Sequence, residues 1–151
     1  MTTTQTLLSL VLASTTSLAP LPLRLALGAV FIAHGAQKLF GAFGGYGLEG
    51  TGGWMDSIGL SPGYLLALLA GLVEFFGGIA VIIGLLTRPA ALAAATLMVV
   101  AITSVHLQNG FFMSNNGYEF SLTLLTGFVS LLISGPGRFA VDNLIAARVG
   151  R

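Results

Sequence analysis

The residues best placed to do chemistry lie within Phe31–Gly41, where an otherwise apolar stretch reads FIAHGAQKLFG. His34, Gln37 and Lys38 are spaced so that a helix would place all three on one face. A charge at membrane depth costs roughly 2.5–3.5 kcal/mol on insertion scales, so these side chains must face partners inside a helical bundle. Their types predict a site that hydrogen-bonds a polar ligand head or transfers protons.

The partners expected for this face come from three further apolar runs. Glu74 falls near the middle of the second run, where a carboxylate is costly unless it is paired or protonated. If the four apolar runs cross the membrane in alternating directions, three more polar residues fall in the same outer half of the bundle: His106, Tyr118 and Glu119. The candidate catalytic residues are His34, Lys38, Glu74 and Glu119. The candidate cofactor-binding residues are His34, Gln37, Lys38, His106 and Tyr118.

Purely structural roles would explain the same residues. Lys38 could extend its ammonium to the outer headgroups, or form an ion pair with Glu74 or Glu119 that only fixes helix packing. His106 and Glu119 could be interfacial residues without a task in binding. The sequence leaves both interpretations open.

The composition predicts a membrane protein. Of the 151 residues, 55% are hydrophobic and 7% are charged, whereas a soluble domain carries about 25% charged residues. The mean hydropathy is +0.94. A net charge of +1 gives no reason to expect nucleic acid as a partner. The lack of cysteine excludes thiol–disulfide exchange by this chain alone, as well as cysteine-ligated zinc or iron–sulfur centres, and we expect no metal site.

Four apolar runs predict an all-α fold, an integral membrane four-helix bundle with short or glycine-rich loops. The spans are expected at about residues 21–40, 64–86, 89–107 and 119–134, and the fourth is slightly short for the roughly 20 residues that cross a bilayer. Continuous apolar runs without alternation favour helices over a β-barrel. None of the runs has the polar face that a soluble bundle requires.

The bundle domain is expected over residues 21–137, between two flanking segments. Residues 1–20 lack an early basic residue, so an interfacial segment is favoured over a signal peptide. Residues 138–151 read as a cytoplasmic amphipathic tail whose apolar side chains lie in the membrane.

Charges between the spans predict the orientation. Arg24, Arg88 and the arginines of the tail fall on one side, and Glu49, Asp56 and Glu119 fall on the other, where no arginine occurs. The positive-inside rule then places both termini in the cytoplasm, which agrees with an even number of spans.

The connections and small residues carry weaker signals. Residues 41–63 hold nine of the 21 glycines, and Gly45–Gly50 spells GxGxxG. A nucleotide site would need a strand before this motif, so after a membrane helix we expect a flexible or re-entrant lid instead. Small residues four apart predict close helix packing; these are Ala29/Ala33, Ala80/Gly84 and Ala91/Ala95.

Taken together, these positions resemble the DoxX family of small four-span bacterial membrane proteins. The resemblance runs from about Leu21 to Asp142 and rests on Arg24, Gly28, His34–Gly41, Glu74, Gly77, Gly78, Gly84, Thr87, Arg88, His106, Tyr118, Glu119, Gly135–Arg138 and Asp142. It implies a bacterial inner membrane, contact with lipid, and redox chemistry of the thiosulfate:quinone oxidoreductase type from which the family takes its name. It assigns no catalytic role to any of these residues.

Three functions fit this reading. The first is a quinone-associated oxidoreductase subunit, in which His34 or Lys38 hydrogen-bonds the quinone head and Glu74 or Glu119 exchanges protons. Its electrons would come from a bound cofactor, an outer-side substrate, or a soluble or membrane redox partner protein. The second is a non-catalytic scaffold that recruits a redox enzyme. The third binds haem b between His34 and His106. The oligomeric state stays open, a homo-oligomer included.

Overall fold

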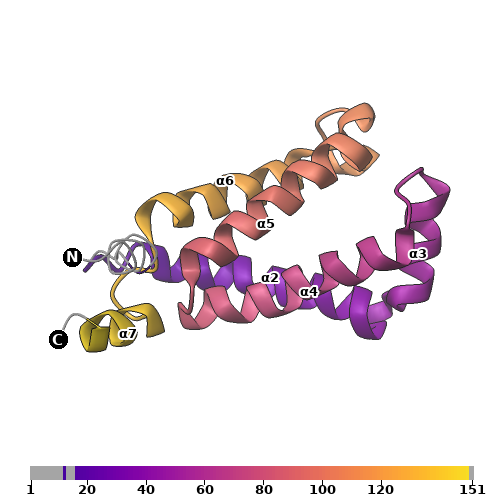
Figure 1. The fold of residues 1–151 in the computed structure, drawn as a ribbon. Coiled ribbons are helices and arrows are strands. Elements are labelled where there is room, and N and C mark those ends of the chain that lie inside the picture. Colours follow the sequence, from indigo (N-terminus) through magenta and orange to yellow (C-terminus); the bar gives the residue numbers. More distant parts are fainter. Residues whose placement is uncertain (1–11, 13–15, 150–151) are drawn as a thin grey trace.

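Two antiparallel pairs of long helices form the body of the protein. The computed structural model describes residue 12 and residues 16–149, so most of the expected interfacial segment at 1–20 lies outside the described residues. α2 (Pro20–Phe40) pairs with α4 (Gly63–Ile83), and α5 (Thr87–Ala101) pairs with α6 (Glu119–Ser134). Figure 1 shows the two pairs close together at one end of the molecule and separated at the other. The expected all-α fold is confirmed, with helix bounds close to those predicted.

The helices differ in whether they are long and apolar enough to cross a membrane. Gly63–Ile83 and Thr87–Asn109 are each long and apolar enough to span, and α2 passes the same test only together with the helical segment Ala42–Ser57, from which it is bent by 97°. α6 is apolar but has 16 residues, which is about 24 Å of helix. Length and composition therefore support two or three spans among the described residues, and a fourth span stays a prediction.

The third apolar helix has an irregular end. After α5 the chain continues through a π-helical turn at Ile102–His106 and a 3₁₀ turn at Leu107–Asn109. Together they extend the helical segment past the predicted end at Leu107. A π turn rotates the side chains that follow it relative to a regular helix, and such turns are frequent at functional sites.

Glycines bring α2 and α4 into close contact. A Cβ on Gly78 would lie 2.8 Å from the carbonyl oxygen of Gly28 and 2.9 Å from the backbone nitrogen of Ile32. The expected small-residue pairs do not make this contact, and Ala29 is exposed. Ala91 and Ala95, by contrast, are buried in the core. Close packing through small residues is therefore present, but α2 and α4 achieve it through glycines.

The connection over residues 41–63 contains a helix, where a flexible or re-entrant lid was expected. α3 (Gly47–Ser57) packs against α4 across the open end of the bundle (Figure 1). Asp56 joins the two helices, because its carboxylate accepts hydrogen bonds from Ser61 Oγ (2.7 Å) and from the backbone N–H of Gly63 (2.8 Å). These two hydrogen bonds lower the pKa of Asp56. No strand precedes GxGxxG in the described chain, so the motif does not form a nucleotide-binding turn.

The opposite end is closed by a buried arginine. Arg24, expected as a flanking charge at the rim, is 1% exposed. Its guanidinium donates to the carbonyl oxygens of Val81 (2.8 Å), Ile82 (2.6 Å), Pro136 (2.8 Å) and Phe139 (2.7 Å). Arg24 therefore ties α2 to the end of α4 and to the segment that follows α6, which corrects the expectation of a merely peripheral charge.

The tail is also fastened to this end. α7 (Val141–Val149) begins next to Asp142, which is fully buried and accepts hydrogen bonds from the N–H groups of Leu86 (2.7 Å) and Thr87 (3.0 Å). A carboxylate at the start of α5 satisfies free N–H groups and favours the helix dipole. Leu144 is exposed, as a surface helix requires. The tail thus has an exposed apolar side chain and a buried anchor that was not expected.

The two ends of the described chain meet. The backbone N–H of Arg138 donates to the carbonyl oxygen of Ser17 (3.0 Å), and Figure 1 shows the beginning of α2 and α7 at the same end of the bundle. The chain therefore leaves the bundle on the side where it enters, as the even number of apolar helices predicts.

Candidate functional site

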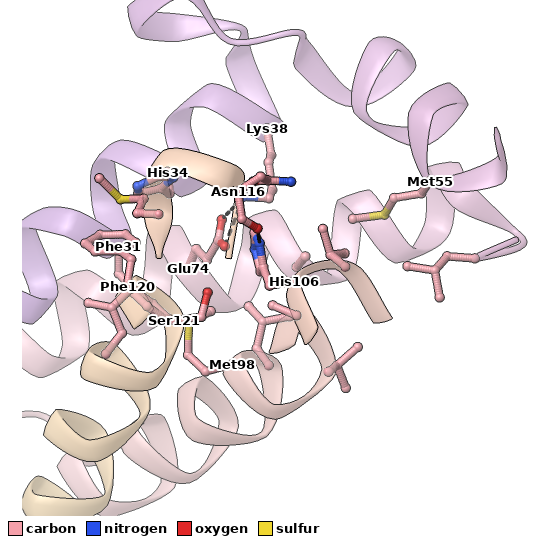
Figure 2. Close-up of a pocket in the computed structure, with 18 of the residues that line it drawn as sticks. Phe31, His34, Lys38, Met55, Glu74, Met98, His106, Asn116, Phe120 and Ser121 are labelled. Atoms are coloured by element: carbon pink, nitrogen blue, oxygen red, sulfur yellow. Dashed lines mark hydrogen bonds and ion pairs between the residues drawn. The ribbon is translucent and has the colours of Figure 1, made fainter. Parts of the chain in front are cut away.

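A cavity of about 380 Å³ lies between the two helix pairs, toward the end where they separate. Its walls come from α2, α3, α4, α5 and α6 and from the turn before α6. Most of the lining is apolar, including Phe31, Met98 and Leu124, and the polar residues His34, Lys38, Glu74 and His106 interrupt it. Figure 2 shows these four polar side chains around the middle of the cavity. Residues from four predicted spans therefore meet, although they are far apart in sequence.

The ion pair between Lys38 and Glu74 forms one wall of this cavity. Lys38 Nζ lies 2.7 Å from Glu74 Oε2 and 3.0 Å from Oε1. The Glu74 residue is 5% exposed and the Lys38 side chain 22%. Because Glu74 is buried among apolar side chains, the ammonium provides the partner that the carboxylate needs there. Of the two carboxylates considered for Lys38, the structure selects Glu74.

The two histidines line the same cavity but have different surroundings. His34 lies one turn before Lys38 on α2, is exposed, and faces the Phe120 ring with 6.1 Å between ring centroids. His106 lies at the end of the π-helical turn, and its Nδ1 is 2.9 Å from the carbonyl oxygen of Asn116. That contact fits an Nδ1–H donor, which leaves Nε2 as an acceptor. His34 has the more accessible imidazole of the two.

Gln37 lines a second, neighbouring cavity of about 730 Å³ beneath α3. Its Nε2 donates to the carbonyl oxygen of Phe43 at 3.4 Å. This second cavity reaches the surface at Tyr46, which is 84% exposed. Four residues belong to both linings: His34, Lys38, Trp54 and Asn116. The ammonium of Lys38 and the imidazole of His34 therefore border both cavities, the second of which reaches the surface at Tyr46.

Tyr118 and Glu119, also predicted as site residues, line neither cavity. Glu119 Oε1 accepts a hydrogen bond from the backbone N–H of Met113 (2.6 Å), and the Tyr118 ring packs edge-on against Phe111. Both residues shape the turn that leads into α6. Glu119 is therefore not placed to exchange a proton with a ligand in the cavity, in contrast to the expected role.

Several lining residues were not proposed from the sequence. Ser121, Met55 and Met98 line the first cavity, and Trp54 and Asn116 line both. Ser121 is 6% exposed within an apolar helix, so the reasoning that singled out Glu74 could have found it. Asn116 precedes a glycine in a connection between apolar runs, where this pair is typical of a turn and does not indicate a site. The methionines carry no sequence signal, because an apolar helix uses methionine anywhere in its core.

The polar residues of the first cavity supply hydrogen-bonding groups and charge within a mostly apolar lining. In the part of the chain that the structure describes, no group of three histidine, aspartate or glutamate side chains could hold a metal ion. Lys38 has donor capacity beyond the pair with Glu74, because an ammonium carries three N–H groups. The site is suited to a flat, mostly apolar molecule with hydrogen-bond acceptors.

Family comparison agrees with the motifs that line this chamber. The DoxX family model matches residues 19–107. This stretch holds His34, Lys38, Glu74 and His106. This chain belongs to the DoxX family. As a DoxX protein with long apolar helices, it is a membrane protein and sits in a lipid bilayer.

Individual relatives cover most of the chain. "Inner membrane protein YqjF" of Escherichia coli is 35% identical over 124 residues, which is 81% of this chain and 88% of that protein. "Uncharacterized membrane protein Rv3486" of Mycobacterium tuberculosis is 35% identical over 136 residues, covering 83% and 80%. "Putative oxidoreductase CatD" of Bacillus subtilis is 33% identical over 123 residues, covering 82% and 84%. No solved structure matches the chain significantly.

Proposed function

We propose that this DoxX protein is the quinone-binding subunit of an oxidoreductase in the bacterial inner membrane, with both termini in the cytoplasm. The observation that carries the proposal is the Lys38–Glu74 ion pair in the wall of an apolar cavity of about 380 Å³. The relatives' names support it: one is called an inner membrane protein and one a putative oxidoreductase. The arginines gathered at the α7 end support the orientation.

The lining fits a quinone. A quinone head is a flat ring with two carbonyl oxygens, which need hydrogen-bond donors, and a ring surface, which needs apolar contacts. Lys38 and His34 are the donors, and Phe31, Met98 and Leu124 are apolar walls. Glu74 holds Lys38 in place through both carboxylate oxygens. A bound quinone supplies the two-electron redox chemistry.

Reducing the quinone to the quinol takes up two electrons and two protons. The chain holds no thiol, and we propose that a redox partner protein supplies the electrons. Protons reach the site through the second cavity, because His34 and Lys38 line both chambers and Tyr46 at its mouth is exposed. His34 is the residue placed to pass a proton from that side, and Glu74 keeps the charge of Lys38 balanced.

The test is an absorption spectrum of the protein purified in detergent, with solvent extraction of bound quinone from the same sample. We expect near-stoichiometric quinone in the unsubstituted chain and its loss when Lys38→Met and Glu74→Leu are combined, which removes both charges together. Glu49→Gln is the matched control, because Glu49 is an exposed carboxylate that lines neither cavity. It should retain the quinone.

Two outcomes would overturn the proposal. A colourless, quinone-free protein would favour the non-catalytic scaffold, in which the ion pair only joins α2 to α4. A Soret absorption band that disappears on replacing His34 or His106 would favour haem b, since both histidines line the cavity.

A further inference from the structure

The first cavity is elongated, and its polar residues lie in its middle. Figure 2 shows Phe31 and Phe120 toward one end, Met55 at the other, and Lys38 and Glu74 between them. A ligand head that reaches the ion pair therefore has an apolar arm of the cavity on each side. The two arms differ in how they end.

One arm is closed by the core of the bundle. Phe31 is 1% exposed, Met98 6% and Leu124 7%. All three belong to the hydrophobic core that joins the two helix pairs. These three side chains block the way toward the core, whereas Phe120 at the same end of the cavity is 37% exposed (Figure 2).

The residues toward the other end are partly exposed. Met55 on α3 lies at this end (Figure 2), and Leu60 in the α3–α4 connection and Val100 on α5 line the same cavity. Met55 and Leu60 are adjacent, because the Leu60 N–H donates to the Met55 carbonyl oxygen (2.9 Å). Val100 is 45% exposed and lies within Thr87–Asn109, which is long and apolar enough to span a membrane. The opening therefore lies at an apolar surface that lipid would cover.

We infer that this opening between α3 and α5 is the exit for the hydrophobic tail of a membrane quinone. The inference rests on the proposed function and adds the orientation of the ligand: the ring lies inward at Lys38 and His34, and the tail runs past Met55, Leu60 and Val100 into the bilayer. Quinones that carry a tail should then bind more tightly than the bare ring, because the arm buries part of the chain.

The arrangement also separates two routes. In the proposed function protons arrive through the second cavity, whereas the tail leaves through the apolar arm. His34, Lys38 and Trp54 line both cavities. A ligand bound in the reverse direction would push its tail toward the buried Phe31.

The experiment compares two probes with the full-length protein in detergent: decylubiquinone, and the same dimethoxy-methyl-benzoquinone ring without the alkyl chain. Val100→Trp obstructs the opening. Val99→Trp is the matched control, because Val99 is 46% exposed on the same helix and does not line the cavity. We expect Val100→Trp to weaken binding of decylubiquinone about tenfold, as excluding roughly two methylene groups would. Binding of the bare ring should change less than about twofold, and Val99→Trp should affect neither probe.

The outcomes separate this inference from the proposed function. Unchanged binding of decylubiquinone to Val100→Trp, or equal losses in Val100→Trp and Val99→Trp, would overturn the tail exit while the bare ring still binds. If neither probe binds the unsubstituted chain, the proposed function fails and the tail exit with it. Leu60→Trp obstructs the opening from the opposite wall and replaces Val100→Trp if circular dichroism shows that variant to be unfolded.

Discussion

At the scale of single residues, the Lys38–Glu74 ion pair places two charges in the wall of a mostly apolar cavity. Burying two charges is expensive, and their mutual attraction offsets that cost only while both are present. A well-packed apolar pair of similar size can therefore match the stability of the ion pair. In the proposed function, the charges are needed because the ligand hydrogen-bonds the ammonium of Lys38. The same substitutions should therefore affect the free energy of unfolding and quinone binding differently.

Glu74→Leu alone should lower the free energy of unfolding in detergent by about 3 kcal/mol, because it leaves the ammonium of Lys38 without its partner. Adding Lys38→Met should restore most of that loss without restoring quinone binding. Chemical denaturation followed by circular dichroism measures the first effect, and solvent extraction measures the second. Recovery of quinone binding in the double variant would show that the charges serve packing alone.

At the scale of elements, the contact between α2 and α4 positions the site. Gly28 and Gly78 let the two backbones approach. This close approach brings Lys38 on α2 within reach of Glu74 on α4. On the opposite pair, the π-helical turn at Ile102–His106 ends with His106 in the cavity wall. Helix packing and one irregular turn thus bring the polar residues together.

Gly78→Ala should therefore destabilise the protein by about 2 kcal/mol, because the added methyl group meets the backbone of Gly28 and Ile32 and forces the helices apart. Gly77→Ala is its matched control, since a Cβ at Gly77 meets nothing within 4 Å. That substitution should be neutral or stabilise α4 by up to about 1 kcal/mol through helix propensity. Thermal unfolding of both variants in the same detergent checks the difference; equal effects would contradict the close helix contact.

At the scale of the whole molecule, the two ends of the bundle differ: the helices are joined by buried hydrogen bonds at one end, and the two helix pairs separate at the other. Arg24 and Asp142 fasten α2, α4, α5 and the tail together at the α7 end, using backbone groups at helix ends as partners. At the far end the helix pairs separate around the cavities and α3 covers part of the gap (Figure 1). The fold thus gathers buried hydrogen bonds at one end and the cavities toward the other.

The arginines at the α7 end predict which side of the membrane each end of the bundle faces. The chain has no cysteine, so single cysteines can be labelled without background. Ser114 lies in the exposed turn at the open end and Ala147 lies on α7, where it is also exposed. In intact cells, a membrane-impermeant maleimide that reaches the periplasm should label Ser114→Cys, and it should label Ala147→Cys only after the inner membrane is opened. Labelling of both in intact cells, or of Ala147→Cys alone, would contradict the orientation.

The sequence by itself determined the class of the protein and the extent of its apolar helices. Helix bounds depend on local properties, namely the length of an apolar run and the glycines that end it, so the expected span at residues 119–134 matches α6. Tertiary structure decided which polar residues meet. The choice of Glu74 over Glu119 for Lys38, the burial of Arg24 and Asp142, and the helix in the glycine-rich connection all depend on how helices rotate and pack. These are contacts between distant parts of the chain, and residue spacing along a single run does not encode them.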